Sequence, residues 1–197
     1  MNLEFSILHS QISLLDLFGA AIGLVFIFSE YKASRWLWPS SLLMAAFYAV
    51  INFSIGWYAN TGICIYNFVI SVYGLLVWRG LLQSKERQER PIGSCPARLW
   101  PWLVAATLGL TLALRWLLGI LGESTMPWLD GLSAALGIVG MWMLSQKYWQ
   151  QWLFWLVSEP ILVYIYLSTG YTASACMYAV YEVFCILGII RWKKLSR

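Results

Sequence analysis

The chain has 197 residues, of which 60% are hydrophobic and only 11% are charged. Soluble proteins average about 25% charged residues, so the composition excludes an ordinary soluble domain and predicts a protein embedded in the lipid bilayer. The net charge of +4 does not indicate a nucleic-acid partner, because the distribution of the basic residues follows the topology predicted below.

Seven apolar segments predict seven transmembrane helices. About 20 mostly apolar residues are needed to cross the ~30 Å hydrocarbon core as a helix. Unbroken apolar runs favour helices over barrel strands, which would alternate in polarity. The predicted spans are residues 14–28, 36–53, 58–78, 99–118, 128–144, 149–167 and 172–192. We therefore predict an all-α membrane protein with a single transmembrane domain over residues 1–197.

The basic residues predict the orientation of these spans. The sequence contains 13 Lys and Arg residues, and all but Arg115 fall on the side of the membrane that carries the C-terminus. By the positive-inside rule, that side is cytoplasmic, with the N-terminus outside. The basic connection 79–98 is interpreted as a solvated cytoplasmic loop.

An internal repeat appears when the chain is aligned with itself at a shift of 114 residues. The matched pairs are Asp16 and Asp130, Trp38 and Trp152, Gly74 and Gly188, and Trp78 and Trp192. We interpret the two aspartates as residues at helix starts. The repeat predicts a 3+1+3 architecture, in which residues 14–78 and 128–192 form parallel three-helix units and residues 99–118 form a linker helix. Parallel repeats of this kind place a substrate near the bilayer midplane.

The cysteines and the one histidine carry no recognisable chemistry. Cys64, Cys176 and Cys185 lie in apolar spans, and Cys95 lies in the basic loop. Their positions predict neither a metal site nor a disulfide framework. His9 alone cannot support a histidine metal centre or a serine–histidine hydrolase. We therefore expect no cofactor and no enzymatic activity.

The sixth span contains the leading candidate site. Trp152, Trp155 and Glu159 are spaced i, i+3 and i+7, so they share one face of a helix. A carboxylate this far inside an apolar helix is costly and usually marks a site or a pathway. Two indole rings beside a buried anion can bind a flat cationic ring by stacking and cation–π attraction.

Other polar and aromatic residues at depth complete the predicted substrate site. Asn67 and Glu182 lie mid-span, although Asn67 can instead join helices and Glu182 can be hydrogen-bonded by nearby tyrosines. Trp36 and Trp38 are expected in the interfacial aromatic belt. The remaining candidates are Tyr66, Trp142, Tyr164 and Tyr181.

Several short stretches carry a family pattern. They include Glu30-Tyr31-Lys32-Ala33, Trp36-Leu37-Trp38-Pro39, Ile65-Tyr66-Asn67-Phe68, Ser71-Val72-Tyr73-Gly74 and Trp152-Leu153-Phe154-Trp155. Together they resemble the Pnu family of bacterial vitamin transporters, over residues 14–194. The resemblance implies a SWEET-like 3+1+3 fold, a homotrimer in the bacterial inner membrane, and facilitated diffusion of an unphosphorylated vitamin. Phosphorylation in the cytosol would then trap the vitamin.

The substrate expected from this resemblance is thiamine. Cys64 and Met141 stand where nicotinamide riboside carriers of the PnuC type tend to have glutamines, and Glu159 replaces an Asp or Asn. These departures look closer to the thiamine-carrying PnuT branch. Nicotinamide riboside is the alternative because it is also cationic and Glu159 suits either molecule. Riboflavin and a sugar are weaker alternatives.

Overall fold

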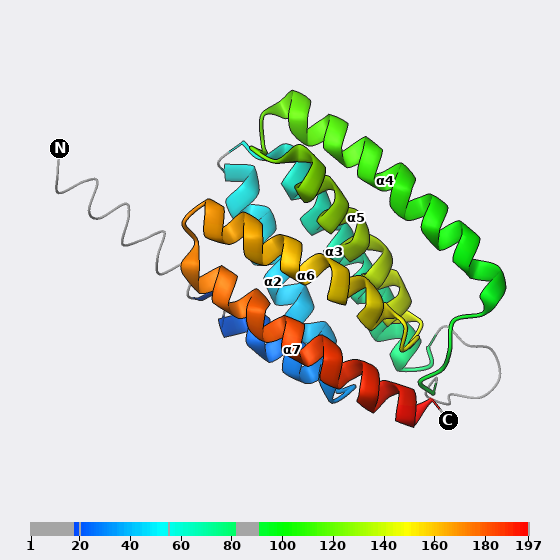
Figure 1. The fold of residues 1–197 in the computed structure, drawn as a ribbon. Helices are drawn as coiled ribbons and strands as arrows, with labels where there is room; N and C mark the ends of the chain where they lie inside the picture. Colours follow the sequence, from blue (N-terminus) through cyan, green and yellow to red (C-terminus); the bar gives the residue numbers. More distant parts are fainter. Residues whose placement is uncertain (1–17, 20, 55, 82–90, 197) are drawn as a thin grey trace.

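The computed structural model describes residues 18–19, 21–54, 56–81 and 91–196, and helices dominate this part of the chain. The first described helix is Ala21–Tyr31. It is followed by α2 (Leu37–Ser54), α3 (Tyr58–Trp78), the short η1 (Ala97–Leu99), α4 (Trp100–Leu121), α5 (Pro127–Ser145), α6 (Gln151–Ser168) and α7 (Thr172–Leu195) (Figure 1). Asp16 lies outside the described residues.

Five of the predicted spans are confirmed as helices long and apolar enough to cross a membrane. They are α2, α3, the η1–α4 segment, α5 and α7. The helix α6 does not reach this hydropathy because it carries Gln151, Glu159 and Pro160 among its apolar residues. The described helix Ala21–Tyr31 ends three residues later than the predicted boundary at residue 28. This extension brings Glu30 into the last turn of the helix.

The helices pack in neighbouring pairs around α5. The pairs are α2 with α3 and α6 with α7, and α5 contacts α3, α4 and α6. Figure 1 shows α4 along one edge of the bundle, beside α5. The first described helix lies against α7, since the Tyr181 hydroxyl donates a hydrogen bond to the carbonyl of Gly23. Residues from both ends of the chain therefore meet in one interior.

Backbone conformations recur at the spacing of the sequence repeat. Ala33 and Lys147 have φ values of 52° and 56° at equivalent helix ends. Gly56 and Gly170 have φ values of 81° and 85° in equivalent turns. Left-handed conformations are uncommon for residues other than glycine, so their repetition at Ala33 and Lys147 is specific. Both pairs are separated by the 114 residues found in the sequence.

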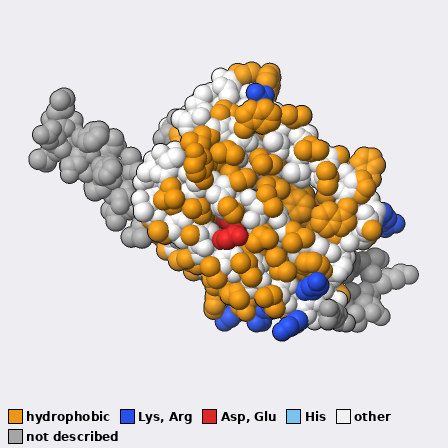
Figure 2. Space-filling view, viewed as in Figure 1, with side chains coloured by type: hydrophobic (Ala, Val, Ile, Leu, Met, Phe, Trp, Pro, Cys, Tyr) orange, Lys and Arg blue, Asp and Glu red, His pale blue; other side chains and the backbone are white. Residues whose placement is uncertain are grey.

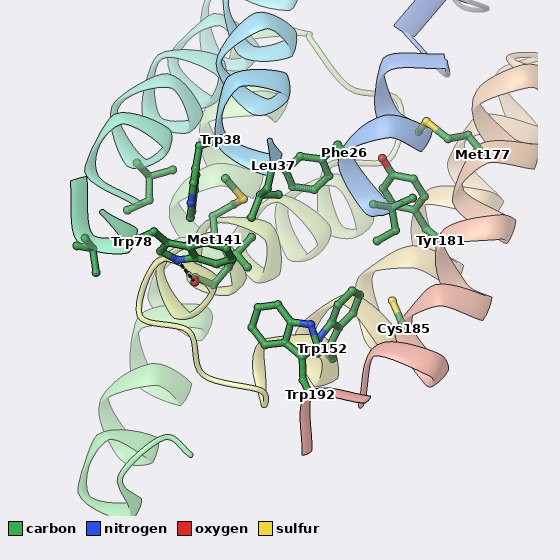
Figure 3. Close-up of a cluster of buried hydrophobic side chains, with 14 residues drawn as sticks. Phe26, Leu37, Trp38, Trp78, Met141, Trp152, Met177, Tyr181, Cys185 and Trp192 are labelled. Atoms are coloured by element: carbon green, nitrogen blue, oxygen red, sulfur yellow. Dashed lines mark hydrogen bonds between the residues drawn. The ribbon is translucent and has the colours of Figure 1, made fainter. Parts of the chain in front are cut away.

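Two tryptophan clusters repeat at the same spacing. They consist of Trp38, Gly74 and Trp78, and of Trp152, Gly188 and Trp192. Figure 3 shows the four tryptophans as two separate pairs. In each cluster the first indole lies on the glycine, where a Cβ atom would come within 2.2 Å and 2.4 Å of the ring, respectively. The two indoles of each cluster meet edge to face, at centroid distances of 5.4 Å and 5.9 Å. Only glycine leaves room for this packing.

One tryptophan of each cluster also donates a hydrogen bond to a backbone carbonyl in the other half of the chain. The Trp78 indole donates to the carbonyl of Leu144 at 3.4 Å, and the Trp192 indole donates to that of Glu30 at 3.2 Å. Leu144 and Glu30 are themselves separated by 114 residues. Each half of the chain therefore holds the other in the same way. The division into two three-helix units and a linker remains a prediction that these matches support.

Two interpretations of the sequence are corrected by the packing. Trp38 is fully buried in its cluster and does not belong to an interfacial belt, whereas Trp36 is 74% exposed. The described part of the connection 79–98 does not lie free in solvent. Gly93 pairs with the α5–α6 connection through hydrogen bonds of 3.0 Å and 3.1 Å, and the buried Cys95 donates its backbone N–H to Gln150. This segment is docked because the α5–α6 connection offers it unpaired backbone groups.

Acidic residues stabilise two helix starts. Asp130 lies in the first turn of α5 and accepts a hydrogen bond from Ser124, as expected for a residue at a helix start. Glu123, in the connection before α5, is buried and accepts hydrogen bonds from the backbone of Ala59 at 2.8 Å and of Asn60 at 3.0 Å. It thereby satisfies two of the free N–H groups at the start of α3.

Candidate substrate-binding site

Three carboxylates gather in the interior of the bundle. Glu30 is 1% exposed, Glu159 is 3% exposed, and Glu182 is half-buried. Each has one buried oxygen atom with no hydrogen-bond partner among the described residues. The carboxyl groups of Glu30 and Glu182 both interact electrostatically with that of Glu159. Buried carboxylates without partners are costly, so this interior is suited to a cation.

The surface around this region is otherwise apolar. Figure 2 shows a small acidic patch in the middle of a face covered by hydrophobic side chains, near α6 and α7. The basic groups of that view lie toward the ends of the molecule. This distribution matches a protein whose flanks face lipid and whose charged ends face water.

The predicted face of α6 is confirmed as a face directed inward. Trp152 is fully buried, Trp155 is partly buried and Glu159 is buried. The three residues nevertheless differ in what they can do. Trp152 is enclosed by Gly188 and Trp192, so its ring builds the core and does not reach a ligand in this conformation.

Trp155 joins two parts of the chain by its indole nitrogen. Its ring lies against α5, where a Cβ atom on Gly140 would come within 3.1 Å of it. Its Nε1 donates to Glu30 Oε1 at 3.1 Å and also to Gln151 Oε1. The indole of Trp155 therefore connects Glu30 to the face of α6 that also carries Glu159.

The predicted tyrosines occupy three different environments. Tyr181 is buried and its hydroxyl is bound to the first described helix. The hydroxyl of Tyr66 donates to the Ile138 carbonyl at 2.7 Å, which pins α3 to α5. Tyr164 is 57% exposed, in contrast to Tyr181, and its place in the substrate site remains a prediction.

The other two candidates lie at the margins of the interior. Asn67 is partly buried on α3, and its backbone carbonyl accepts a hydrogen bond from Ser71 at 2.6 Å. Trp142 is partly buried and packs beside Tyr148 at a centroid distance of 6.3 Å. Substrate binding by these two residues remains a prediction.

Two buried polar residues of this site were missed from the sequence. Glu30 was placed beyond the end of the first span, and Gln151 was assigned no role. The position of Glu30 in the last turn of a helix, where a carboxylate opposes the helix dipole, is visible only in the structure. The repeat did offer a signal in the sequence. Leu144 matches Glu30 and Leu37 matches Gln151, so each polar residue stands where the other half of the chain has a leucine.

Comparison with known proteins decides the family. The model of the family described as nicotinamide mononucleotide transporter matches residues 13–194. The chain belongs to this family. The resemblance to Pnu transporters seen in the sequence is thereby confirmed at the level of the family.

Curated relatives of the nicotinamide mononucleotide transporter family carry two substrate names. The nicotinamide riboside transporter PnuC of Neisseria mucosa is 26% identical over 177 residues, which are 84% of this chain and 66% of the relative. PnuC of Escherichia coli is 23% identical, over 95% of this chain and 88% of the relative. The riboflavin/roseoflavin transporter RibM of Streptomyces davaonensis is 24% identical, over 100% of this chain and 93% of the relative.

A solved structure shares the fold. The crystal structure of the vitamin B3 transporter PnuC superposes with a TM-score of 0.74 at 21% identity, covering 98% of this chain and 86% of that one. The chain is thus a membrane vitamin transporter of the PnuC family, and its family and structural neighbour are transporters, not enzymes. The names of these relatives do not support thiamine, and they favour the alternative, nicotinamide riboside.

Proposed function

We propose that this transporter takes up nicotinamide riboside. The observation that carries the proposal is Glu159, a buried carboxyl group one helical turn after Trp155, whose Oε2 lacks a partner among the described residues and which interacts with the carboxyl group of Glu182. Nicotinamide riboside has a flat pyridinium ring with a positive charge, which suits a buried carboxylate and an indole ring. Riboflavin has no such charge, so the carboxylates favour the pyridinium compound.

Thiamine is the competing substrate because its thiazolium ring is also cationic. Its charge would satisfy Glu159 equally well. The names of the PnuC relatives support nicotinamide riboside over thiamine. The two molecules are therefore best separated by direct competition.

The proposed mechanism is facilitated diffusion through the bacterial cytoplasmic membrane. We propose two parallel three-helix units, residues 14–78 and 128–192, that rock around the site between them, with the segment of α4 as linker. The reciprocal hydrogen bonds of Trp78 and Trp192 support this division. The N-terminus would lie outside, the C-terminus in the cytoplasm, and three copies would form a homotrimer. Phosphorylation of the vitamin in the cytosol would keep uptake running.

Uptake into proteoliposomes tests this function. Labelled nicotinamide riboside should equilibrate across the membrane without a pH gradient, and unlabelled nicotinamide riboside should compete better than thiamine or riboflavin. Liposomes without protein are the control. Stronger competition by thiamine would reverse the substrate assignment. A strict requirement for a pH gradient would refute facilitated diffusion, because carboxylates can also form proton relays in transporters.

A further inference from the structure

The contact between Glu30 and α6 leaves a donor and an acceptor unused. The Trp155 indole nitrogen is shared by Glu30 Oε1 and Gln151 Oε1. The other atom of each group, Glu30 Oε2 and Gln151 Nε2, is buried and has no hydrogen-bond partner among the described residues. The two side chains interact at close range, but this approach does not give Nε2 or Oε2 a hydrogen bond of ordinary geometry.

Two unused polar atoms in one place are unusual in a protein interior. Most buried polar groups have a partner, and each that lacks one costs free energy. Here one atom accepts and the other donates. A single group that can both donate and accept a hydrogen bond would satisfy the two together.

The repeat shows that the fold itself does not require polar residues at these positions. Leu144 matches Glu30 and Leu37 matches Gln151 at the shift of 114 residues. Both leucines are fully buried in the same apolar cluster. The backbone carbonyls of Glu30 and Leu144 even accept equivalent indole hydrogen bonds. The same location is therefore filled by a leucine pair in one half and by a polar pair in the other.

The polar pair is aligned with the proposed cation site. Gln151, Trp155 and Glu159 are spaced i, i+4 and i+8, so they follow one face of α6. At about 1.5 Å per residue, Gln151 and Glu159 are roughly 12 Å apart along the axis, with Trp155 between them. A flat ring held at Trp155 would have a carboxylate on one side and the polar pair on the other.

We infer that Glu30 and Gln151 form a second polar subsite, which binds an uncharged group of the substrate that both donates and accepts hydrogen bonds. This inference rests on the proposed function. Two parts of nicotinamide riboside have this chemistry, the carboxamide and the ribose hydroxyls. Because a carboxylate has no hydrogen to donate to Glu30, the subsite also disfavours substrates that carry a carboxylate in this position.

Titration calorimetry on the purified full-length protein tests the subsite with three ligands. They are nicotinamide riboside, nicotinic acid riboside, in which a carboxylate replaces the carboxamide, and N-methylnicotinamide methylated on the ring nitrogen, which keeps the cationic ring but lacks the ribose. Glu30→Gln retains an acceptor for Trp155 but gains a donor. We expect it to bind nicotinamide riboside about tenfold more weakly or worse, and to discriminate less against nicotinic acid riboside.

The other ligands and variants show which part of the substrate, the carboxamide or the ribose, binds to the subsite. An equal loss for N-methylnicotinamide assigns the subsite to the carboxamide, whereas a loss confined to nicotinamide riboside assigns it to the ribose. Gln151→Leu, which introduces the residue found at the matched position Leu37, should weaken binding of the same ligand. Glu123→Gln is the matched control, because this glutamate is also buried but binds the backbone at the start of α3. The affinity of this variant for each ligand should equal that of the wild type.

The outcomes distinguish the inference from the function on which it rests. If the wild type binds nicotinamide riboside and Glu30→Gln and Gln151→Leu bind all three ligands unchanged, the polar pair is structural and the inference is wrong. If the wild type does not bind nicotinamide riboside, the proposed function is wrong and the inference falls with it.

Discussion

The substitution Glu159→Gln should lower substrate affinity without lowering stability. Glu159 is 3% exposed, has an oxygen atom without a partner among the described residues, and interacts with the carboxyl groups of Glu30 and Glu182. A glutamine of nearly the same shape removes an ionisable group from a buried position beside two other carboxyl groups, so the free energy of unfolding should stay equal or increase. The bound cation loses its anion at the same time.

The size of the affinity loss follows from the interaction that is removed. A hydrogen bond or contact to a charged group contributes about 1.5–3 kcal/mol, and each 1.4 kcal/mol corresponds to about tenfold in the dissociation constant. We therefore expect nicotinamide riboside to bind roughly 10- to 100-fold more weakly. Titration calorimetry measures the affinity, and thermal unfolding in detergent measures the stability.

Glu123→Gln provides the opposite pattern and serves as the control. The Glu123 carboxylate accepts backbone hydrogen bonds of 2.8 Å and 3.0 Å at the start of α3. A neutral amide keeps only one acceptor there and faces the same N–H groups with a donor. The Tm should fall while the affinity stays unchanged. Unchanged affinity in Glu159→Gln would refute our assignment of Glu159, and a fall in its Tm similar to that of Glu123→Gln would indicate a structural role.

Three further predictions concern the aromatic residues. In calorimetry, Trp155→Ala should cost more affinity for the substrate than Trp38→Ala. Trp38→Ala should instead lower the free energy of unfolding by about 3–5 kcal/mol, as expected for a large side chain removed from a core. Equal affinity losses would contradict the assignment of Trp155 to the site and of Trp38 to the core. Gly188→Ala should reduce the yield and Tm of folded protein, because its Cβ would lie 2.4 Å from the Trp152 ring. Tyr164→Ala should leave uptake into proteoliposomes unchanged, since this side chain is 57% exposed, and a large loss would place Tyr164 in the site.

The sequence was sufficient for the helices and for the repeat, because both depend on local and periodic signals. Apolar length located the five helices that qualify as spans. Glycines and tryptophans at the same shift indicated packing units, and Trp38 and Trp152 occupy equivalent places. The helix start at Asp130 was also predictable from the preference of acidic residues for that position.

The direction of individual side chains was not predictable in the same way. In a membrane protein both the buried and the lipid-facing sides of a helix are apolar, so periodicity does not separate them. Tyr164 and Tyr181 therefore appeared equivalent, although one is exposed and the other buried. The end of the first described helix was missed because Glu30 and Lys32 resembled the start of a loop. Burial of Glu30 depends on Trp155, which lies 125 residues away in the chain.

The differences between the halves indicate where the substrate binds. The shared tryptophan clusters give both halves the same framework. At the positions that differ, Ser41 matches Trp155 and bonds to Ser71 at 2.6 Å, so its face of α2 is closed by the protein itself. The matched face of α6 instead carries the indole of Trp155, and two buried atoms beside it lack partners among the described residues. Because Glu30 and Gln151 beside Trp155 each leave a polar atom without a partner among the described residues, whereas Ser41 and Ser71 bond to each other, we expect a single substrate molecule to bind on the side of α6.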